Sequence, residues 1–402
     1  MKRVLALSTI YPNAANPRFG TFVARSLESL AKRGDWRVNV INPIGLPPIG
    51  LGALSPRYRD LAALPEREES GGVTIHRPRF TLIPKIGARR NVGAIARAAL
   101  PVARAIDAEA SVDVVDAQYF FPDGPAAAAL ARDLGAPLSI KARGSDINYW
   151  GTVGFAREAM LDAAREAAGL LSVSEALARE MVRLGIPREA ITVHYTGLDR
   201  DLFRPFDHTQ LRAQLGAALG FPLPDAAPLF ACVGALNGHK GQDIAIEALV
   251  RMSVDYPEAR LLLVGKGEEE ASLRSLAQER GLGARVHFTG SVDHTTLPLI
   301  LSAADAMVLP TKNEGLANAW VEAIACGTPV VTSDVGGARE LVHGDVAGRL
   351  TPRDPQAVAE ALRAILRDPP DAQAVADHAQ AFDWTTHASA LAAHYEGLSK
   401  TS

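Results

Sequence analysis

The chain has 402 residues, of which 48% are hydrophobic and 22% are charged. This composition is ordinary for a folded globular protein, and the length suits two domains, so a disordered or fibrous chain is excluded. No apolar run is long enough to span a bilayer, and the two cysteines do not have the spacing of a metal site or a disulfide framework. We therefore expect a cytoplasmic protein.

Charge is distributed unevenly along the chain. Residues 1–205 carry 27 basic and 21 acidic side chains, whereas the remainder carries 15 and 24. The stretch from Gly71 to Ile106 has no carboxylate and holds these basic residues: Arg77, Arg79, Lys85, Arg89, Arg90, Arg97 and Arg104. This basic run over 77–104 is either a solvated face or a contact for anionic lipid headgroups or an anionic acceptor. The net charge of −3 gives no indication of a nucleic-acid partner.

The first half of the chain alternates short apolar runs with helical patterns. Strands are predicted over residues 3–10, 38–41, 112–117, 138–142, 170–173 and 191–194, and helices over 20–33, 92–106, 125–134, 155–168 and 175–184. Such alternation favours a parallel sheet with helices on both faces. Residues 43–79 are rich in proline and predict a long irregular loop over the mouth of a cleft.

Polar residues follow several of these strands. Gln118 and Asp123 come after the strand at 112–117, and Arg143 and Asp146 come after the strand at 138–142. Arg143 and Asp146 either form a structural ion pair or face the cleft as substrate groups. Gly20 stands at the start of a helix after the first strand, which is a phosphate-type corner but a weak signal by itself.

The pattern breaks over residues 201–228, where several prolines surround one weak helix, and we interpret this segment as a linker. Alternation then restarts, with strands predicted over 229–233, 260–264, 286–288, 306–309 and 329–332. The fold class is therefore α/β, with two doubly wound domains whose binding loops surround a shared cleft.

Two glycine-containing turns follow the first strands of the second half. Gly234 begins the loop Gly234–Gly241, in which Lys240 could supply a positive charge to a phosphate or could be a solvated lysine at a turn. Its spacing is not that of a P-loop. Gly265 marks a similar turn, with the same alternatives.

The most informative stretch runs from Leu309 to Leu350. A buried strand is followed by a loop with Glu314, and then by a helix that ends at Cys326 with Gly327 at the capping position. The amide groups and dipole of a helix start favour an anion at this point. Glu314 is placed to face the cleft, whereas Glu322, taken alone, is better explained as a solvated helix carboxylate. No spacing in the sequence predicts a metal site.

These features together resemble the family 4 retaining glycosyltransferases of GT-B fold. The resemblance rests on Glu314, seven residues, Glu322, the following Ala-Cys-Gly-Thr-Pro-Val-Val, the pair Gly336-Gly337, and the upstream Val-Gly-x-Leu-x-x-x-Lys-Gly. The first half, with Phe121-Pro-Asp-Gly124 and Arg143-Gly-Ser-Asp146, is similar to the teichuronic acid biosynthesis subgroup. The resemblance implies a nucleotide-sugar donor, UDP- or GDP-linked, and no other cofactor or metal.

The resemblance also implies domains and residue roles. Residues 1–200 would bind a glycan or lipid-linked acceptor, residues 229–383 would bind the donor, and a final helix at about 384–398 would pack back on the first domain. Lys240 would contact the diphosphate, Glu314 the donor sugar and Glu322 the ribose. The other implied donor-side residues are Gly20, Gly234, Gly265, Gly315, Leu316, Ala317 and Asn318, and those on the acceptor side are Gln118, Asp123, Arg143 and Asp146. We expect Glu314, Lys240 and Arg143 to be catalytic.

One departure from the family leaves other functions to consider. Members often have an arginine after the glycine of Val-Gly, where this chain has Ala235. The missing charge leaves the phosphates to Lys240, helix amides and Arg143. The main hypothesis is hexose transfer to an envelope glycan or lipid-linked acceptor, and its rivals are a sugar-nucleotide epimerase and an inactive subunit that only binds sugar nucleotides.

Overall fold

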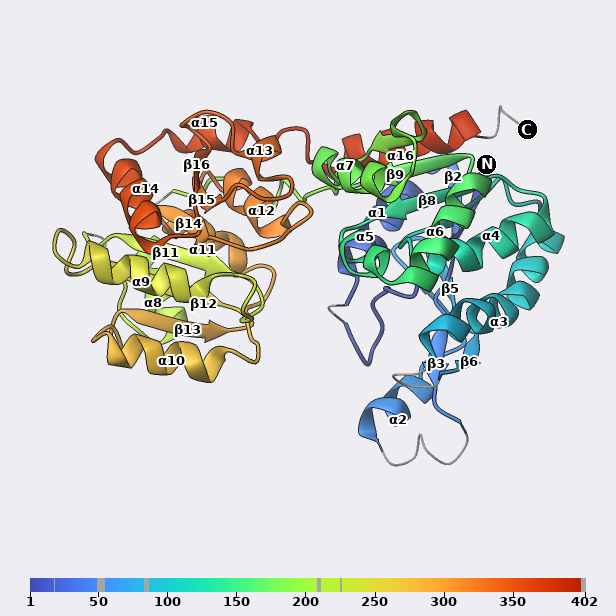
Figure 1. Ribbon diagram of the computed structural model, residues 1–402, viewed down its shortest axis with the longest axis horizontal. Coiled ribbons are helices and arrows are strands. Elements are labelled where there is room, and N and C mark those ends of the chain that lie inside the picture. Colours follow the sequence, from blue (N-terminus) through green and yellow to red (C-terminus); the bar gives the residue numbers. More distant parts are fainter. Residues whose placement is uncertain (18, 49–54, 83–86, 208–210, 225, 399–402) are drawn as a thin grey trace. The chain divides into compact units, whose positions relative to one another are not determined.

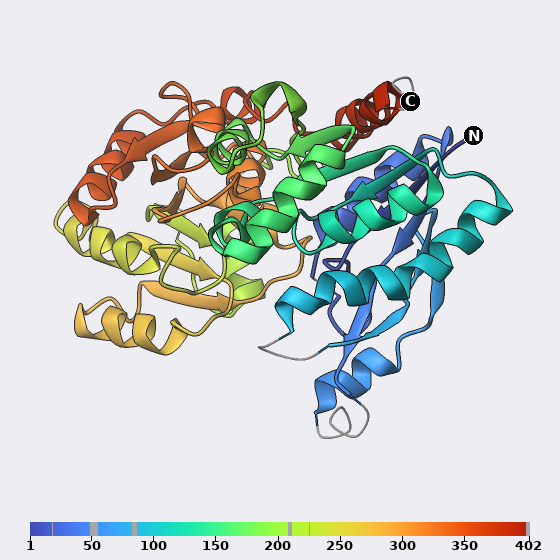
Figure 2. The same cartoon turned by 45° about the vertical axis from the view of Figure 1, so that its right-hand side comes forward.

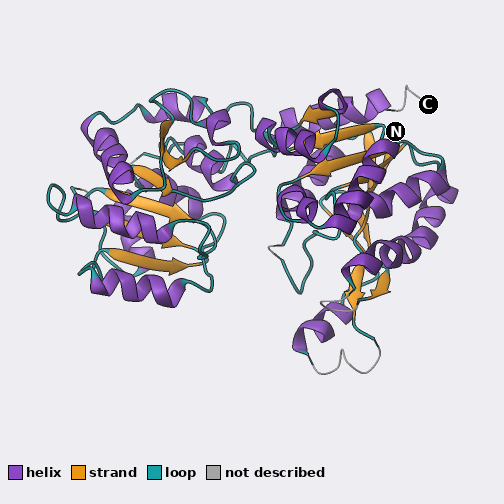
Figure 3. Ribbon diagram, in the orientation of Figure 1, coloured by secondary structure: helices purple, strands orange, loops and turns teal. Residues whose placement is uncertain are grey.

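The computed structural model describes residues 1–402 except 18, 49–54, 83–86, 208–210, 225 and 399–402. The chain forms two compact units, the first made of Met1–Gly197 and Trp384–Ser402 and the second of Leu198–Asp383. In each unit, helices flank the strands of a sheet (Figure 3). This is the α/β architecture that the alternating sequence pattern predicts.

The first unit is built on an eight-stranded sheet with the order β10-β9-β8-β7-β1-β2-β5-β4. Its strands are β1 (Lys2–Leu7), β2 (Trp36–Ile41), β4 (Arg67–Ser70), β5 (Val73–His76), β7 (Val114–Ala117), β8 (Leu138–Ala142), β9 (Gly169–Ser172) and β10 (Ile191–Val193). All pairs are parallel except β4 with β5. Val4 of β1 lies between Val38 of β2 and Val114 of β7, and all three side chains are buried in one hydrophobic core.

Most helices of the first unit lie along this sheet, whereas α2 lies beside the short strand β3 (Ile44–Leu46) (Figures 1 and 2). They are α1 (Thr21–Lys32), α2 (Pro56–Ala62), α3 (Ala88–Glu109), α4 (Asp123–Leu134), α5 (Ser145–Asn148), α6 (Gly154–Glu166), α7 (Glu175–Leu184) and α16 (Trp384–Leu398). The last of these packs against α1, and its Leu391 and Tyr395 are fully buried in the core that also holds Trp36. The segment after the second unit thus completes the core of the first.

The region predicted as a long irregular loop, residues 43–79, contains several regular elements in its described part, and residues 49–54 lie outside the described residues. It contains β4, β5 and α2, and a separate two-stranded sheet pairs β3 (Ile44–Leu46) with β6 (Arg79–Thr81). The strands are only three or four residues long, which is too short for a periodic pattern to separate them from turns. That prediction was therefore wrong.

The second unit has a six-stranded parallel sheet. Its strands are β11 (Leu229–Val233), β12 (Arg260–Val264), β13 (Val286–Gly290), β14 (Ala306–Leu309), β15 (Val330–Ser333) and β16 (Gly348–Thr351), in the order β13-β12-β11-β14-β15-β16. Numbered within the unit, this is the order 3-2-1-4-5-6 of a doubly wound fold. The direction of winding reverses between β11 and β14, and ligands of such folds usually bind outside the carboxyl ends of the strands at this point.

The helices of the second unit begin with one in the segment predicted as a linker. They are α8 (Leu211–Leu219), α9 (Gln242–Met252), α10 (Glu270–Glu279), α11 (Leu297–Ala303), α12 (Asn318–Ala325), α13 (Ala338–Leu341), α14 (Pro355–Arg367) and α15 (Ala372–Asp377). Arg212 of α8 is buried, donates hydrogen bonds to the carbonyls of Ala303 and Ala227, and pairs with Asp305 at 2.9 Å. Residues 201–228 therefore do not form a free linker, because one buried arginine ties α8 to its unit.

Candidate active site

The site in the second unit begins where β11 and β14 end. The loop after β11 runs from Gly234 to Gly241, and the loop after β14 runs from Pro310 to Ala317. Both loops emerge at the switch point of the sheet, which is the usual ligand-binding edge of such folds. Gly241 has φ +76° and begins α9, and the Gln242 side chain donates to the carbonyl of Ala235 at 2.9 Å. The first loop is thereby fixed on its own helix.

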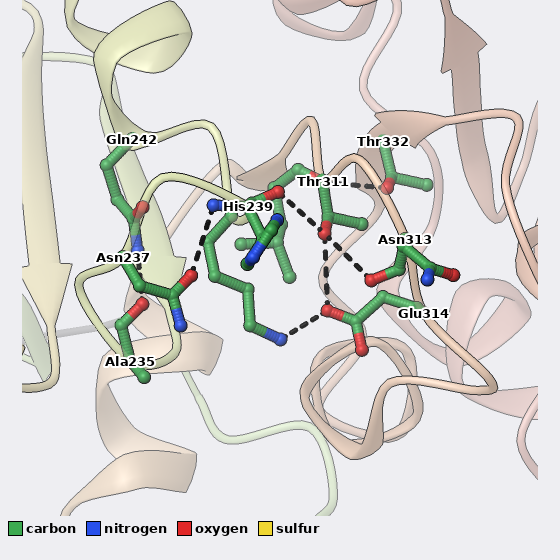
Figure 4. Close-up of polar contacts among 10 residues, drawn as sticks. Ala235, Asn237, His239, Gln242, Thr311, Asn313, Glu314 and Thr332 are labelled. Carbon is green, nitrogen blue, oxygen red and sulfur yellow. Dashed lines mark hydrogen bonds and ion pairs between the residues drawn. The ribbon is translucent and has the colours of Figure 1, made fainter. Parts of the chain in front are cut away.

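An ion pair joins the two loops. The Nζ of Lys240 donates to Oε1 of Glu314, and both side chains are largely but not completely buried, at 22% and 15% exposed. Thr311 contacts both loops, since its Oγ1 lies 3.3 Å from the same carboxylate oxygen and donates to the His239 carbonyl at 3.1 Å (Figure 4). The lysine and the glutamate are thus held together at the edge of the sheet, where a ligand can reach both.

The start of α12 lies directly after Glu314. Ala317 is its N-cap and supplies no side-chain hydrogen bond, and the Trp320 amide donates to the Ala317 carbonyl at 3.0 Å. The positive end of the helix dipole, with the amides of Asn318 and Ala319, favours an anionic ligand at this point. Gly336, with φ +53°, lies against this loop, and the Gly337 amide donates to the Gly315 carbonyl at 2.6 Å. A Cβ on Gly336 would lie 1.9 Å from the Glu314 carbonyl oxygen. The two loops can approach so closely only because glycine occupies that position.

The remaining donor-side predictions fall at three different places. Gly265 follows β12 and lies against the loop after β11, where a Cβ would come within 2.0 Å of the Gly234 carbonyl oxygen. Glu322 is half-buried on α12, one turn beyond Leu316, Ala317 and Asn318. Gly20 belongs to the first unit, where it precedes α1 with φ +72°. The structure therefore gathers the predicted residues 234–322 in one unit and Gly20 in the other.

In the first unit, the predicted acceptor-side residues lie around the switch point between β1 and β7. Asp123 is fully buried and accepts hydrogen bonds from the Thr9 amide at 3.0 Å and the Thr9 hydroxyl at 2.7 Å. Burial raises the pKa of the Asp123 carboxyl to about 7, although the Thr9 donors act in the opposite direction. This contact joins the loop after β1 to the start of α4.

The guanidinium group of Arg143 is held by Gln118 and not by the carboxylate of Asp146. Its Nε donates to the Gln118 carbonyl at 2.7 Å, its Nη2 donates to the Gln118 side chain, and its guanidinium lies 4.9 Å from the centre of the Phe22 ring. Burial lowers the pKa of Arg143 to about 10. Arg143 thus remains a cation with its guanidinium fixed at the edge of the sheet.

The carboxylate of Asp146 is occupied by backbone groups. It accepts hydrogen bonds from the amides of Phe120 at 2.8 Å, Arg143 at 3.0 Å, Gly144 at 2.7 Å and Ile147 at 3.1 Å. Burial raises the pKa of this carboxyl, and the four amides counteract the rise. Asp146 therefore braces the loop after β8, and the alternative of an Arg143–Asp146 side-chain ion pair is not what the structure has.

Two residues that take part in these clusters were not predicted. Thr9 and Thr311 each hold a site carboxylate, but a single threonine in a loop has no distinctive spacing that could have drawn attention to it. Among the residues that the structure describes, no group of three His, Cys, Asp or Glu side chains is arranged to hold a metal ion. The same residues contain no helix long and apolar enough to cross a membrane.

Solved structures share this fold over nearly the whole chain. Sucrose-phosphate synthase from Thermosynechococcus elongatus has a TM-score of 0.75 and 23% identity, with all of both chains covered. HepE of Anabaena, solved in complex with UDP-glucose, has a TM-score of 0.72 and 22% identity, covering 99% of this chain and all of the other. The fold is therefore that of the GT-B glycosyltransferases.

Sequence comparisons define the family. Residues 19–197 match the glycosyl transferase 4-like domain, and residues 220–382 match glycosyl transferases group 1. The chain belongs to this group of glycosyltransferases, which act on nucleotide sugars.

Its relatives have several different substrates by name. A Bacillus subtilis glycosyltransferase assigned by name to teichuronic acid biosynthesis, TuaC, is 28% identical over the full length of both chains. A D-inositol 3-phosphate glycosyltransferase of Catenulispora acidiphila is 35% identical over 223 residues, which is 52% of each chain. A glycogen synthase of Mycobacterium tuberculosis is 38% identical over 169 residues, covering 40% of this chain and 41% of the other.

Proposed function

We propose that the protein transfers a hexose from a UDP- or GDP-linked sugar to a cell-envelope or exopolysaccharide acceptor, with retention of the anomeric configuration and without a metal ion. The observation that carries the proposal is the Lys240–Glu314 pair at the start of α12. The complex of HepE with UDP-glucose and the full-length likeness to TuaC support the donor and the acceptor class. We place the reaction in the cytoplasm, with peripheral membrane contact through the basic run 77–104.

The proposed chemistry needs positive potential at the donor phosphates. When the bond between the sugar C1 and the diphosphate oxygen breaks, the nucleoside diphosphate leaves with the electron pair and gains negative charge. Lys240 and the amides at the start of α12 stabilise this charge. The acceptor hydroxyl oxygen then bonds to C1 on the same face, and its proton passes to the departing phosphate oxygen.

Glu314 has a different part in this proposal. In the structure its carboxylate neutralises Lys240, and an incoming diphosphate would take over the lysine. The released carboxylate would then accept hydrogen bonds from hydroxyls of the donor sugar, while Glu322, further along α12, would bind the ribose. The pair would thus keep the lysine oriented before the donor arrives.

The first test is transfer activity in two variants, Lys240→Gln and Glu314→Gln. Removing the preorganised positive charge of Lys240 from a site where negative charge develops lowers kcat by about a hundredfold, and we expect a loss of this size in Lys240→Gln. Glu314→Gln replaces the carboxylate that accepts hydrogen bonds from the donor sugar with a neutral amide, and we expect a loss of about tenfold from the weaker hydrogen bonds. Arg274→Gln is the control, because it removes an exposed cation of the same unit on α10 that pairs with Glu270. Full transfer activity of Glu314→Gln would refute the role given to Glu314.

The rival functions need a second assay. Ala235 gives the phosphates no side-chain charge, and this favours an inactive binding subunit as the second candidate. A thermal-shift panel of nucleotide sugars identifies the donor, because a specific ligand stabilises the folded state by mass action. Incubation with that donor alone and then with acceptor distinguishes the outcomes: an epimer indicates an epimerase, binding without any product indicates an inactive subunit, and transfer supports the proposal.

A further inference from the structure

The structure divides the basic run of the first unit into residues with different surroundings. Arg77 is fully buried and pairs with Glu68 at 2.6 Å, and Arg104 pairs with Asp133 at 2.5 Å. Lys85 lies outside the described residues. Arg90 and Arg97 are exposed on α3, and within the described part of the chain neither has an ion-pair partner. An exposed arginine that has no ion-pair partner can bind an anion without first breaking an internal ion pair.

These two arginines line a pocket between β6 and the first turns of α3, which lie side by side (Figure 1). The pocket has a volume of about 450 Å³. We call it the arginine pocket, and its lining residues are Arg79, Phe80, Thr81, Gly87, Arg90, Asn91, Ala94, Arg97 and Ala98. None of the described residues that line it is a carboxylate, so their contribution to its potential comes from guanidinium groups.

Arg79 gives the pocket a fixed cationic wall. Its Nη2 donates to the carbonyls of Leu64 and Ala62, which anchors the side chain from one side. Its Nη1 is buried and has no hydrogen-bond partner among the described residues. Burial lowers the pKa of Arg79, and Glu66 is the carboxylate that counteracts this effect. A buried guanidinium nitrogen without an acceptor is costly, and an anion would remove the cost.

The helix presents its two arginines toward the same side. Arg90 and Arg97 are seven residues apart, which is close to two turns of an α-helix. Between them Ala94 is small, and Asn91 adds an amide that can donate a hydrogen bond. Guanidinium groups bind phosphate through two parallel hydrogen bonds, so three of them around one pocket suit a phosphate better than a single carboxylate.

The pocket lies on the side of the sheet where the acceptor-side residues are found. β3 and β6 follow directly on the carboxyl ends of β2 and β5, at the same edge as Thr9 and Arg143. Phe80 also lines a second pocket, of about 260 Å³, whose lining includes Thr9, the partner of Asp123. A molecule with its reacting hydroxyl near Asp123 could therefore extend along the second pocket toward the arginines.

We propose that the arginine pocket binds the phosphate group of a phosphorylated acceptor. The phosphate can belong to a lipid headgroup or lipid-linked glycan, or to a soluble phosphorylated acceptor. The role in acceptor binding rests on the proposed function, whereas phosphate binding by the pocket does not. The proposal gives the exposed arginines of the basic run a class of ligand, the phosphate group. Arg77 and Arg104 keep structural roles in their ion pairs.

The test compares two double variants. Arg90→Gln with Arg97→Gln removes two pocket arginines, and Arg37→Gln with Arg89→Gln removes the same charge from exposed positions of the first unit that do not line the pocket. The probes are glycerol 3-phosphate, vesicles containing phosphatidylglycerol, and vesicles of phosphatidylcholine alone. Two lost charge-assisted hydrogen bonds weaken affinity by about tenfold or more, and we expect this loss in the pocket variant and less than about twofold in the control.

Each outcome decides the proposal. Loss of glycerol 3-phosphate binding in the pocket variant supports a soluble phosphorylated ligand, and loss of binding only to phosphatidylglycerol vesicles supports a lipid headgroup. Equal losses in both variants, or a wild-type chain that binds none of the probes, would overturn it. Donor binding, measured in the same samples, keeps the two proposals separate. If the pocket proposal is wrong, phosphate binding is absent or unspecific while the donor still binds. If the proposed function is wrong, the donor is not turned over while phosphate still binds in the pocket.

Discussion

Two glycines of the second unit have similar backbone conformations but very different surroundings. Gly336 has φ +53° and Gly344 has φ +74°. A Cβ on Gly344 would meet nothing within 4 Å, whereas one on Gly336 would meet the backbone of the Glu314 loop. The comparison separates the cost of the left-handed conformation from the cost of displacing the site.

We expect Gly344→Ala to lower the free energy of unfolding by about 1 kcal/mol, since only the backbone strain of a left-handed alanine applies. Gly336→Ala adds a steric clash that must push Glu314 away from Lys240, so we expect a larger loss and a donor affinity at least about tenfold weaker. Urea unfolding and donor titration measure the two effects. Equal donor affinities in the two variants would show that the contact with Gly336 does not position Glu314.

Individual site residues show what sequence patterns can and cannot predict. Lys240 and Glu314 were both selected from the sequence, because each lies in a polar loop after an apolar strand. Their direct contact was not predicted, since it joins loops 74 residues apart and depends on which strands are neighbours in the sheet. Asp146 was predicted to lie on the acceptor side. Its hydrogen bonds with four backbone amides were not predicted, because no sequence pattern shows where amide groups point.

Among the elements, α16 carries a group whose protonation is linked to the stability of the first unit. His394 lies with its Nε2 3.3 Å from the Ser139 hydroxyl of β8, and burial lowers its pKa to about 4. In the unfolded chain the same imidazole has a pKa of about 6.5. Between these two values, the unfolded state binds a proton at this position and the folded state does not, so stability falls as the pH falls.

We therefore expect wild type to lose stability relative to His394→Gln between about pH 6.5 and pH 4, by at most about 3 kcal/mol. Above about pH 7 the imidazole is neutral in both states, and the difference between the two proteins becomes constant. Urea midpoints of both proteins at several pH values provide the measurement. A difference that does not change across this range would mean that His394 titrates normally in the folded protein.

Element lengths explain which helices and strands the sequence predicts. Long apolar runs such as Leu229–Val233 and Arg260–Val264 were predicted at the bounds that the structure has, because buried parallel strands need apolar side chains on both faces. The short strands β3 to β6 were missed because surrounding prolines and charges hide four-residue patterns. The sequence predicts only a weak helix at α8, within a linker. The residue that holds this helix in its unit is a buried arginine, and a periodicity of apolar residues treats arginine as a surface residue.

At the scale of the whole molecule, the alternation of strands and helices predicts two doubly wound sheets, and both are found. The sequence alone does not predict that α16 joins the first unit, because a helix that buries Leu391 and Tyr395 could cover either sheet. That expectation came from the family resemblance. The chain therefore leaves the first unit after Gly197 and returns to it at Trp384, so the folding of the two units is connected through the backbone at two points.

Because donor and acceptor ligands are assigned to different units, each should protect its own unit from hydrogen exchange in the full-length chain. At a concentration about 100 times its Kd, a ligand stabilises the folded state by about 2.7 kcal/mol, which slows exchange about a hundredfold where opening releases the ligand. We expect UDP or GDP to protect residues 234–241, 310–325 and 334–340, and glycerol 3-phosphate to protect residues 79–82 and 87–98. Lys240→Gln should lose only the first effect and the Arg90→Gln, Arg97→Gln double variant only the second. Nucleotide protection confined to the first unit would contradict the donor assignment, because every nucleotide contact proposed for Lys240, Glu314 and Glu322 lies in the second.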